Sequence, residues 1–342
     1  MTELAALVDD EALEVLLGAA SALAAGAPIA LADADGHFVA GTPVSSGRSL
    51  PVRLDERTIG LVLYDKTVPE DLAGLVRTSL EMAIRGARHH ASRVRAASEL
   101  AIGRDIQRSL LPRRFPDVAG WRFSAEYEPA REVGGDLYDV FRLRGEREDV
   151  ALLIADVTGK GVPAALLMAD TKALLHAAAD NADEPADALA RVNRILTLER
   201  RSSLFVTAAL AAVDADSGAV RLASAGHEPP LVIRADGRVE PMEASGPILG
   251  AFADASYQVE DFRVEAGETL VLYTDGITDT RDVAGAFYGE RRLLALLAGL
   301  AGASADHVRR AVVDDVRTFR GEAQVFDDLT ILVAHRQARG RP

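Results

Sequence analysis

Four acidic positions in the sequence lie where an apolar run meets glycine or a second aspartate. They are Asp136 in VGGD, Asp156 in IADVTGKG, Asp275 in LYTDG and the pair Asp327 and Asp328 in FDDLT. A single Asp-Gly turn is common, so any one of these positions taken alone is a plain turn. Carboxylates that cluster without cationic partners repel one another strongly. Four such strand ends in one chain therefore predict a site that is held together by divalent cations.

The composition narrows the choice of metal. The chain has no cysteine, and its seven histidines are scattered. The ligands of a metal site would then be oxygen atoms, which Mg²⁺ and Mn²⁺ prefer and which are not typical of Zn²⁺ sites. The lack of cysteine also excludes a disulfide framework, a thiolate zinc site and a cysteine nucleophile.

Size and charge limit the classes of protein to consider. A chain of 342 residues suits two domains better than one. The 52 acidic residues against 38 Lys and Arg give a net charge of −14, which argues against nucleic acid or an anionic membrane as the main partner. Residues 1–10 lack the pattern of a signal peptide, and no stretch of about 18 apolar residues is free of charge. We therefore expect a soluble, cytoplasmic protein.

Residues 1–70 are predicted to form a small α+β domain. A helix is expected over 11–25, and strands over 27–32, 37–40, 49–54 and 58–64. Together with the stretch IGLVLYDK, this order resembles a sensory domain of the GAF/PAS type, at which an upstream signal or regulator would act. A small dimerisation domain that binds no ligand fits the same order of elements.

Residues 71–111 are predicted to form one long linker helix, which Pro112 ends. Apolar residues recur at spacings of three and four, including Val94 and Ala97, which indicates one buried face. A helix of this length that leaves a small domain usually pairs with its copy, so we expect a homodimer. Packing against the chain's own catalytic domain is the alternative.

Residues 112–336 are predicted to form a second α/β (α+β) domain, followed by a polar tail over 337–342. Because strands and helices come in groups without regular alternation, the helices should lie over antiparallel sheets. The predicted strands cover 121–128, 135–143, 150–156, 204–214, 220–225, 231–234, 269–274 and 329–334, and the predicted helices cover 162–179, 186–200, 291–300 and 306–319.

From Ala97 onward the sequence resembles the PPM family of metal-dependent protein phosphatases, in its bacterial SpoIIE/RsbU-type branch. The matching stretches are ELAIGRDIQRSLLP, YEPAREVGGDLYDVF, IADVTGKGVPAALLM, SLFVTAALAAVD, ASAGHEPPLV, GPILG, LYTDGITDT and DDLTILVA. This resemblance implies a PPM-type αββα sandwich of two antiparallel sheets flanked by helices.

The resemblance also implies roles for the acidic residues. Asp156 would bridge two Mn²⁺ or Mg²⁺ ions, and the backbone carbonyl of Val157 would be a neighbouring ligand. Asp136 would bind the second ion, partly through water. Asp275 and Asp327 would bind the first ion.

Five further residues are weaker candidates. Asp328 is counted with the metal ligands, although orienting its neighbours is the favoured role. Arg131 could hold the incoming phosphate, as an arginine does in eukaryotic relatives, and Lys160 could contact phosphate or be a solvated turn residue. His227 could donate a proton to the leaving alkoxide or be a hydrogen-bonded loop residue. Asp139 is an outer metal ligand or, preferably, a hydrogen-bonded strand residue.

The function implied by the resemblance is a Mn²⁺- or Mg²⁺-dependent phosphoserine/phosphothreonine phosphatase. A hydroxide between the two metals would attack phosphorus in line. The implied substrate is a phosphorylated anti-anti-sigma protein with a STAS domain, within a partner-switching pathway. Altered packing of the linker helix could reposition the VGGD strand and so gate the site.

Two other classes of function compete with this reading. A degenerate phosphatase that only docks a partner is disfavoured by the intact acidic set. A metal-dependent nuclease is disfavoured by the acidic charge, and the family resemblance disfavours both a nuclease and a phosphatase for small metabolites.

Overall fold

The computed structural model describes residues 10–144, 149–198 and 204–338. The chain divides into two compact units, Met1–Glu99 and Leu100–Pro342. Helix α2 (Glu70–Leu110) carries residues of both units.

The N-terminal unit is a four-stranded antiparallel sheet with helix α1 (Asp10–Leu23) and the first part of α2. The strand order is β2-β1-β4-β3, and one apolar cluster joins the sheet to both helices. The predicted helix, hairpin and strand pair are confirmed, whereas the GAF/PAS-type assignment stays a prediction. The strands are β1 (Ile29–Asp33), β2 (Phe38–Gly41), β3 (Gly47–Leu54) and β4 (Arg57–Asp65).

Helix α2 is one uninterrupted helix, as predicted from the absence of internal proline. Glu70 and Asp71 occupy its first turn, where negative charge interacts favourably with the helix dipole. Its early part buries residues at the predicted spacing, namely Ala73, Val76, Leu80 and Ile84. Residues 91–99 are all exposed in the single chain, so the predicted burial of Val94 and Ala97 against a second copy stays a prediction. No other described element packs against that stretch within its own unit.

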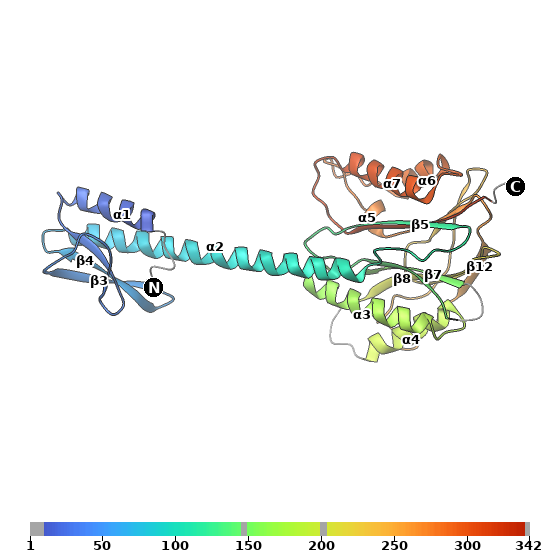
Figure 1. The fold of residues 1–342 in the computed structure, drawn as a ribbon, viewed down its shortest axis with the longest axis horizontal. Coiled ribbons are helices and arrows are strands. Elements are labelled where there is room, and N and C mark those ends of the chain that lie inside the picture. The colour runs from blue at the N-terminus through green and yellow to red at the C-terminus, as the bar shows by residue number, and fades with distance from the viewer. Residues whose placement is uncertain (1–9, 145–148, 199–203, 339–342) are drawn as a thin grey trace. The chain divides into compact units, whose positions relative to one another are not determined.

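The C-terminal unit has four layers, helix–sheet–sheet–helix (Figure 1). One sheet has the strand order β11-β10-β13-β14-β5 and the other β12-β9-β8-β7-β6, and every pairing is antiparallel. Helices α6 and α7 cover the first sheet, and α3 and α4 cover the second. The predicted αββα sandwich is therefore confirmed.

The element bounds follow the sequence pattern closely. The helices are α3 (Val162–Ala179), α4 (Pro185–Leu198), α5 (Asp275–Thr278), α6 (Glu290–Ala298) and α7 (Ala305–Arg320). The strands are β5 (Trp121–Glu128), β6 (Leu137–Arg142), β7 (Asp149–Val157), β8 (Val206–Asp214), β9 (Ala219–Ala225), β10 (Leu231–Ile233), β11 (Val239–Pro241), β12 (Val259–Arg263), β13 (Thr269–Tyr273) and β14 (Leu329–Arg336). The predicted end of α4 at 199–200 and the tail at 339–342 lie outside the described residues.

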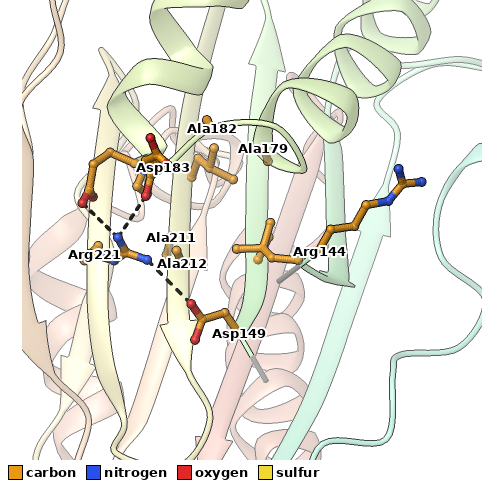
Figure 2. Close-up of a pocket in the computed structure, with 13 residues that line it drawn as sticks. Arg144, Asp149, Ala179, Ala182, Asp183, Ala211, Ala212 and Arg221 are labelled. Atoms are coloured by element: carbon orange, nitrogen blue, oxygen red, sulfur yellow. Dashed lines mark hydrogen bonds and ion pairs between the residues drawn. The ribbon is translucent and has the colours of Figure 1, made fainter. Parts of the chain in front are cut away.

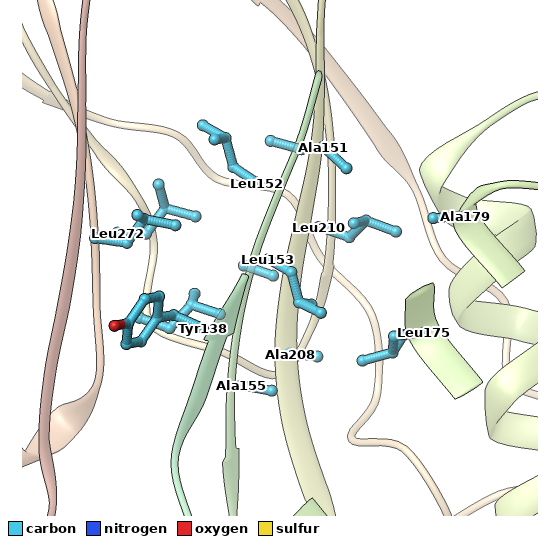
Figure 3. Packing of buried hydrophobic residues seen from close by; sticks show 14 of the residues in the cluster. Tyr138, Ala151, Leu152, Leu153, Ala155, Leu175, Ala179, Ala208, Leu210 and Leu272 are labelled. Carbon is cyan, nitrogen blue, oxygen red and sulfur yellow. The ribbon is translucent and has the colours of Figure 1, made fainter. Parts of the chain in front are cut away.

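The core explains why the central strands are apolar runs with no alternation. Leu152 of β7 points toward Leu272 of the opposite sheet, whereas Leu153 lies on the side of α3, near Leu175 (Figure 3). Successive residues of a strand point to opposite faces. A strand that is covered on both faces therefore needs apolar side chains at every position.

The sequence pattern does not predict three of these elements. Strands β11 and β12 lie at sheet edges, and both are short and half-exposed. Edge strands carry polar residues or proline, such as Pro241 in β11, so their apolar signal is weak. Helix α5 is a single turn that begins at Asp275.

The core between the two sheets should dominate the stability of the C-terminal unit. We expect Leu272→Ala to lower the free energy of unfolding by about 2–5 kcal/mol, because it leaves a cavity between the sheets. The single tryptophan, Trp121, is buried in this unit, so its fluorescence during urea unfolding reports the change. Leu166→Ala is the matched control, since Leu166 on α3 is 65% exposed. An equal loss in both variants would contradict this view of the core.

Candidate metal centre

Antiparallel pairing brings the predicted carboxylates to one edge of the sandwich. Asp136 precedes β6 and Asp156 lies near the end of the neighbouring strand β7. In the other sheet, Asp275 follows β13 and Asp327 precedes the neighbouring strand β14. Because antiparallel neighbours place the end of one strand beside the start of the next, each sheet contributes two positions. Asp156 interacts electrostatically with both Asp275 and Asp327, so the two pairs form one cluster.

Asp136 is the most deeply placed carboxylate of the cluster, with 1% of its surface exposed. Its Oδ2 accepts hydrogen bonds from the hydroxyls of Thr274 at 2.8 Å and Thr330 at 2.5 Å. Its carboxyl also shares a hydrogen bond with Asp156. Burial, followed by repulsion from Asp156 and Asp328, raises the pKa of Asp136 well above its usual range. Within the described ranges, no Lys or Arg forms an ion pair with Asp136 or Asp156.

The pKa values of Asp156 and Asp275 are also raised. Burial raises the pKa of Asp156 to about 6; repulsion from Asp275, Asp327 and Asp328 adds to this, and the hydrogen bond with Asp136 opposes it. Burial also raises the pKa of Asp275, with Asp327 and Asp279 contributing. The raised pKa values mean that the ionised carboxylates are disfavoured. The negative charge of the cluster is therefore not fully compensated by nearby positive charge from the described residues.

Asp328 acts as a clamp on the segment that leads to Asp136. Its Oδ1 accepts the Ala130 N–H at 2.7 Å, and its Oδ2 accepts the N–H groups of Gly135 at 2.6 Å and Asp136 at 3.4 Å. Both oxygens are therefore engaged by backbone donors. This arrangement supports the orienting role for Asp328 over that of a metal ligand.

Two glycines allow backbone segments to touch at the cluster. A Cβ on Gly135 would lie 2.6 Å from the carbonyl oxygen of Val157, and a Cβ on Gly276 would collide with the carbonyl of Asp328. Only glycine fits at such positions. The Val157 carbonyl thus lies beside the VGGD segment, where a metal ligand is predicted.

Gln107 of α2 ties this segment to the helix from the other side. Its Nε2 donates to the Gly134 carbonyl at 2.6 Å, and its Oε1 accepts the Gly134 N–H at 3.1 Å. The hydroxyl of Tyr127 reaches the same Oε1 at 3.4 Å. Gln107 is buried, although its neighbours on α2 are mostly exposed. In IQRSLLP, Gln107 begins the polar run Gln107, Arg108 and Ser109, so no local signal in the sequence sets it apart.

The chemistry of these donors fits divalent cations. Buried, mutually repelling carboxylates and a backbone carbonyl are hard oxygen ligands. The cation in the described ranges that pairs with this cluster is Lys160, whose Nζ lies 3.0 Å from Oδ2 of Asp327. One ammonium does not balance the carboxylates of Asp136, Asp156, Asp275 and Asp327. The residues present therefore fit Mn²⁺ or Mg²⁺, which would supply the missing positive charge.

The oxygen atoms of these carboxylates do not converge closely enough to form a compact group of ligands. In the described ranges, one group of three acidic or histidine side chains has ligand atoms that all lie within 4.8 Å of one another. This group is Asp33, Asp35 and His37, and it is not part of the carboxylate cluster. Oδ1 of Asp33 accepts the N–H groups of Asp35 and His37, so it is used to hold the β1–β2 turn. An ion at the main cluster would be held once its side chains draw together.

The weaker candidates are placed differently. Arg131 is exposed on the bend before β6 and forms no ion pair with a described residue. His227 is buried, its Nδ1 lies 2.8 Å from the Thr207 hydroxyl, and burial lowers its pKa to about 4. A neutral, buried imidazole supports the loop-residue reading over proton donation. Asp139 pairs with Lys172 at 2.5 Å, which supports the hydrogen-bonded strand reading.

Glu228 is a carboxylate near the cluster that sequence reasoning missed. Burial raises its pKa, and Asp275, Asp279 and Glu290 add to the increase. It directly follows His227, so the GHEPP loop brings a further negative charge toward Asp275. The mouth of the site is therefore acidic as well as its interior.

A separate pocket lies at the opposite end of β7 (Figure 2). It has a volume of about 310 Å³, and its lining includes Ala151 and Ala211. Arg221 pairs there with Glu184 at 2.9 Å and Asp149 at 3.7 Å, so its charges are largely satisfied internally. Asp149 begins β7 and Asp156 lies near its end, so this pocket is distinct from the carboxylate cluster.

Comparison with known proteins identifies the family. The family model described as Stage II sporulation protein E (SpoIIE) matches residues 146–337. The chain belongs to the SpoIIE family. Phosphoserine phosphatase RsbU of Bacillus subtilis (strain 168) is 30% identical to this SpoIIE-family chain over 241 residues, which cover 70% of each protein. The family resemblance of the motifs is thereby confirmed.

Other relatives match over part of their length or in fold. Protein IcfG of Synechocystis is 29% identical over 266 residues, which cover 70% of this SpoIIE-family chain and 41% of IcfG. The SiaA-PP2C domain of Pseudomonas aeruginosa has a TM-score of 0.64 at 24% identity, over 72% of this chain and 98% of that domain. The structure of the RsbU and RsbW domains of a Mycobacterium tuberculosis protein has a TM-score of 0.58 at 26% identity. The match covers 67% of this chain and 63% of that one. Within the described ranges, no helix has the length and apolarity needed to cross a membrane.

The stability of the metal-free protein should depend on pH through this cluster. The pKa of Asp156 is raised from 3.8 to about 6 on folding. As pH rises through this window, the unfolded chain ionises first, so the free energy of unfolding falls, by roughly 1–3 kcal/mol for a shift of this size. The loss is complete above the folded pKa. We expect the thermal midpoint of chelator-treated protein to fall as the pH rises from about 4 to about 6 and to change little above that, and Mn²⁺ to raise it at pH 7.5.

Asp156→Asn is the control for this prediction, because it removes the titrating group and keeps the size of the side chain. The variant should show a shallower pH dependence and a smaller response to Mn²⁺. Identical pH profiles for the wild type and the variant would contradict the assignment of the buried charge.

Proposed function

We propose that the chain is a Mn²⁺- or Mg²⁺-dependent protein phosphatase that hydrolyses phosphoserine or phosphothreonine. The observation that carries the proposal is the pair of buried Asp136 and half-buried Asp156, which share a hydrogen bond and have no cationic partner among the described residues. Such a pair needs positive charge that the described residues do not supply. Membership of the SpoIIE family and the similarity to phosphoserine phosphatase RsbU support the reaction class.

The ligand roles are those that the family resemblance implies for these carboxylates. Asp156 would contribute to holding both ions, with the Val157 carbonyl as a neighbouring ligand. Asp136 would hold one ion, and Asp275 and Asp327 the other. Asp328 is assigned to orient the VGGD segment, because both of its oxygens accept backbone N–H groups.

The residues of the chain prepare the site for attack on phosphorus. When bound, divalent cations activate water and offset charge on the phosphoryl oxygens. Thr274 and Thr330 fix the orientation of Asp136 by donating to its Oδ2. Lys160 holds Asp327 from the mouth of the site. The buried His227 is assigned a structural role in the GHEPP loop.

The substrate is proposed to be a phosphorylated anti-anti-sigma protein with a STAS domain, within a partner-switching pathway. The support is the similarity to RsbU and to a solved structure that contains RsbU and RsbW domains. A screen of dephosphorylation against the STAS-domain proteins of the same organism tests this assignment. Phosphoserine turnover on none of them would exclude it.

Helix α2 is proposed to pair with its copy in a homodimer and to carry a signal from the N-terminal unit. Leu75 and Met82 are seven residues apart and 61% and 69% exposed, so they lie on one uncovered face. Gln107, on the same helix, holds Gly134 through two hydrogen bonds. A shift of α2 would therefore move the segment that positions Asp136.

The proposed activity predicts metal-dependent turnover that requires Asp156. We expect wild-type protein to hydrolyse p-nitrophenyl phosphate with Mn²⁺ and to stop when the metal is chelated. Asp156→Ala should lower kcat/KM by at least about a thousandfold, because the position between the ions is lost. Asp314→Asn, at an exposed site on α7, is the control and should be unchanged. Activity without metal, or full activity in Asp156→Ala, would exclude the proposal.

Regulation through α2 predicts that the N-terminal unit alters the site. Removing residues 1–90 should change the Mn²⁺ affinity or the turnover number by at least about threefold, since α2 would lose its packing partners. Sedimentation of the full chain should give a dimer, and Leu75→Glu with Met82→Glu should shift it to a monomer. Equal metal affinity and equal turnover with and without residues 1–90 would count against this mechanism.

A further inference from the structure

A compact hairpin follows the candidate metal ligand Asp275. Arg281 and Phe287 pair across it in an antiparallel bridge. Oδ1 of Asp282 accepts the N–H groups of Ala284 and Ala286, each at 2.9 Å. These bonds are local to residues 281–287, so the hairpin is preorganised by its own sequence.

The hairpin is also fixed to the body of the unit. Tyr288, the next residue, is buried, and its hydroxyl donates to Oδ2 of Asp315 on α7 at 2.7 Å. Its ring meets that of Phe319 edge-on, with centroids 5.5 Å apart. The surface presented by the hairpin is therefore rigid.

This hairpin and the residue before Asp327 form an exposed apolar and cationic surface, here named the Arg281 patch (Arg281, Val283, Phe287 and Phe326). Val283, Phe287 and Phe326 are 77%, 52% and 61% exposed. The Arg281 guanidinium carbon lies 4.3 Å from the centre of the Phe287 ring and 5.4 Å from that of Phe326. Arginine held between aromatic faces is restrained by cation–π contact and keeps its N–H groups free to bind.

The Arg281 patch adjoins the metal centre. Phe326 directly precedes Asp327, and Nζ of Lys160, which pairs with Asp327, lies 4.3 Å from the centre of the Phe326 ring. One edge of the patch is therefore within a residue of a candidate ligand.

Charge distinguishes the Arg281 patch from the rest of the mouth. Glu228, Asp279 and Glu290, which are not assigned as metal ligands, make the surroundings acidic and would repel an approaching phosphoprotein. Arg281 forms no ion pair with any described residue, although carboxylates are plentiful nearby. Lys160, by contrast, is already paired with Asp327. Arg281 is thus a cation available to an incoming anion.

We propose that the Arg281 patch is the docking surface for the polypeptide segment that flanks the phosphorylated residue of the protein substrate. A substrate carboxylate would bind Arg281, and an apolar side chain next to it would pack on Phe287 and Phe326. We expect a small phosphate ester to bind at the candidate metal centre without needing this surface. The proposal rests on the proposed phosphatase function and deepens it by naming what selects a protein over a small ester.

Kinetics on two substrates test the docking surface in the full chain with Mn²⁺. The probes are a phosphoserine peptide with Leu and Glu beside the phosphoserine, and p-nitrophenyl phosphate. Arg281→Ala and Phe287→Ala should each lower kcat/KM for the peptide roughly tenfold, mainly through KM, and change that for p-nitrophenyl phosphate less than about twofold. Arg281→Lys should be intermediate, because it keeps the charge and loses the planar stacking. Arg310→Ala, an exposed arginine on α7, is the matched control.

Charge reversal gives a second, independent test. Arg281→Glu should impair the Leu/Glu peptide and recover at least part of the loss when Lys replaces Glu in the peptide. Unchanged peptide kinetics in Arg281→Ala, or an equal loss on both substrates, would overturn the proposal. If the wild type hydrolyses neither substrate, the proposed function fails. The affinity for the labelled peptide, measured by fluorescence anisotropy, then still tests the docking surface. Equal affinities for wild type and Arg281→Ala would overturn the docking proposal.

Discussion

Repulsion among buried carboxylates is the constraint on which this structure depends. Asp136 and Asp156 face each other inside the sandwich without a cationic partner among the described residues, and burial raises the pKa of both. A folded chain tolerates such a pair when protons or metal ions neutralise it. In the proposed site, divalent cations would serve this purpose at neutral pH. The stability of the fold and the proposed chemistry are therefore linked through the same residues.

The surrounding structure holds the carboxylates in place against this repulsion. Two antiparallel sheets bring separate strand ends to one edge, so no single motif makes the site. Thr274 and Thr330 come from one sheet and bind Asp136, which leads into a strand of the other sheet. Asp328 binds the same segment through the backbone, and Gln107 holds it from α2. The metal centre is thus also the point where both sheets and the long helix are joined.

The sequence predicts well whatever depends on local pattern. Apolar runs located the central strands, because these are buried on both faces, and the Asp-Gly and Asp-Asp motifs located the candidate ligands. The roles of Gln107, Thr274 and Glu228 could not be predicted, because each depends on a contact between segments distant in the chain. Val94 is exposed in the single chain, and its burial against a second copy stays a prediction, since spacing does not say what covers a helix. Strands β11 and β12 were missed because edge strands lack a strong apolar signal.

The most direct test of the account is a calorimetric titration of the metal-free protein with Mn²⁺ near neutral pH. The account predicts two ions bound per chain in the wild type, and the loss of at least one of them in Asp156→Asn and in Asp136→Asn, with Asp314→Asn unchanged. No binding to the wild type, or equal stoichiometry and affinity in all of these proteins, would contradict the claim that divalent cations neutralise the buried carboxylates.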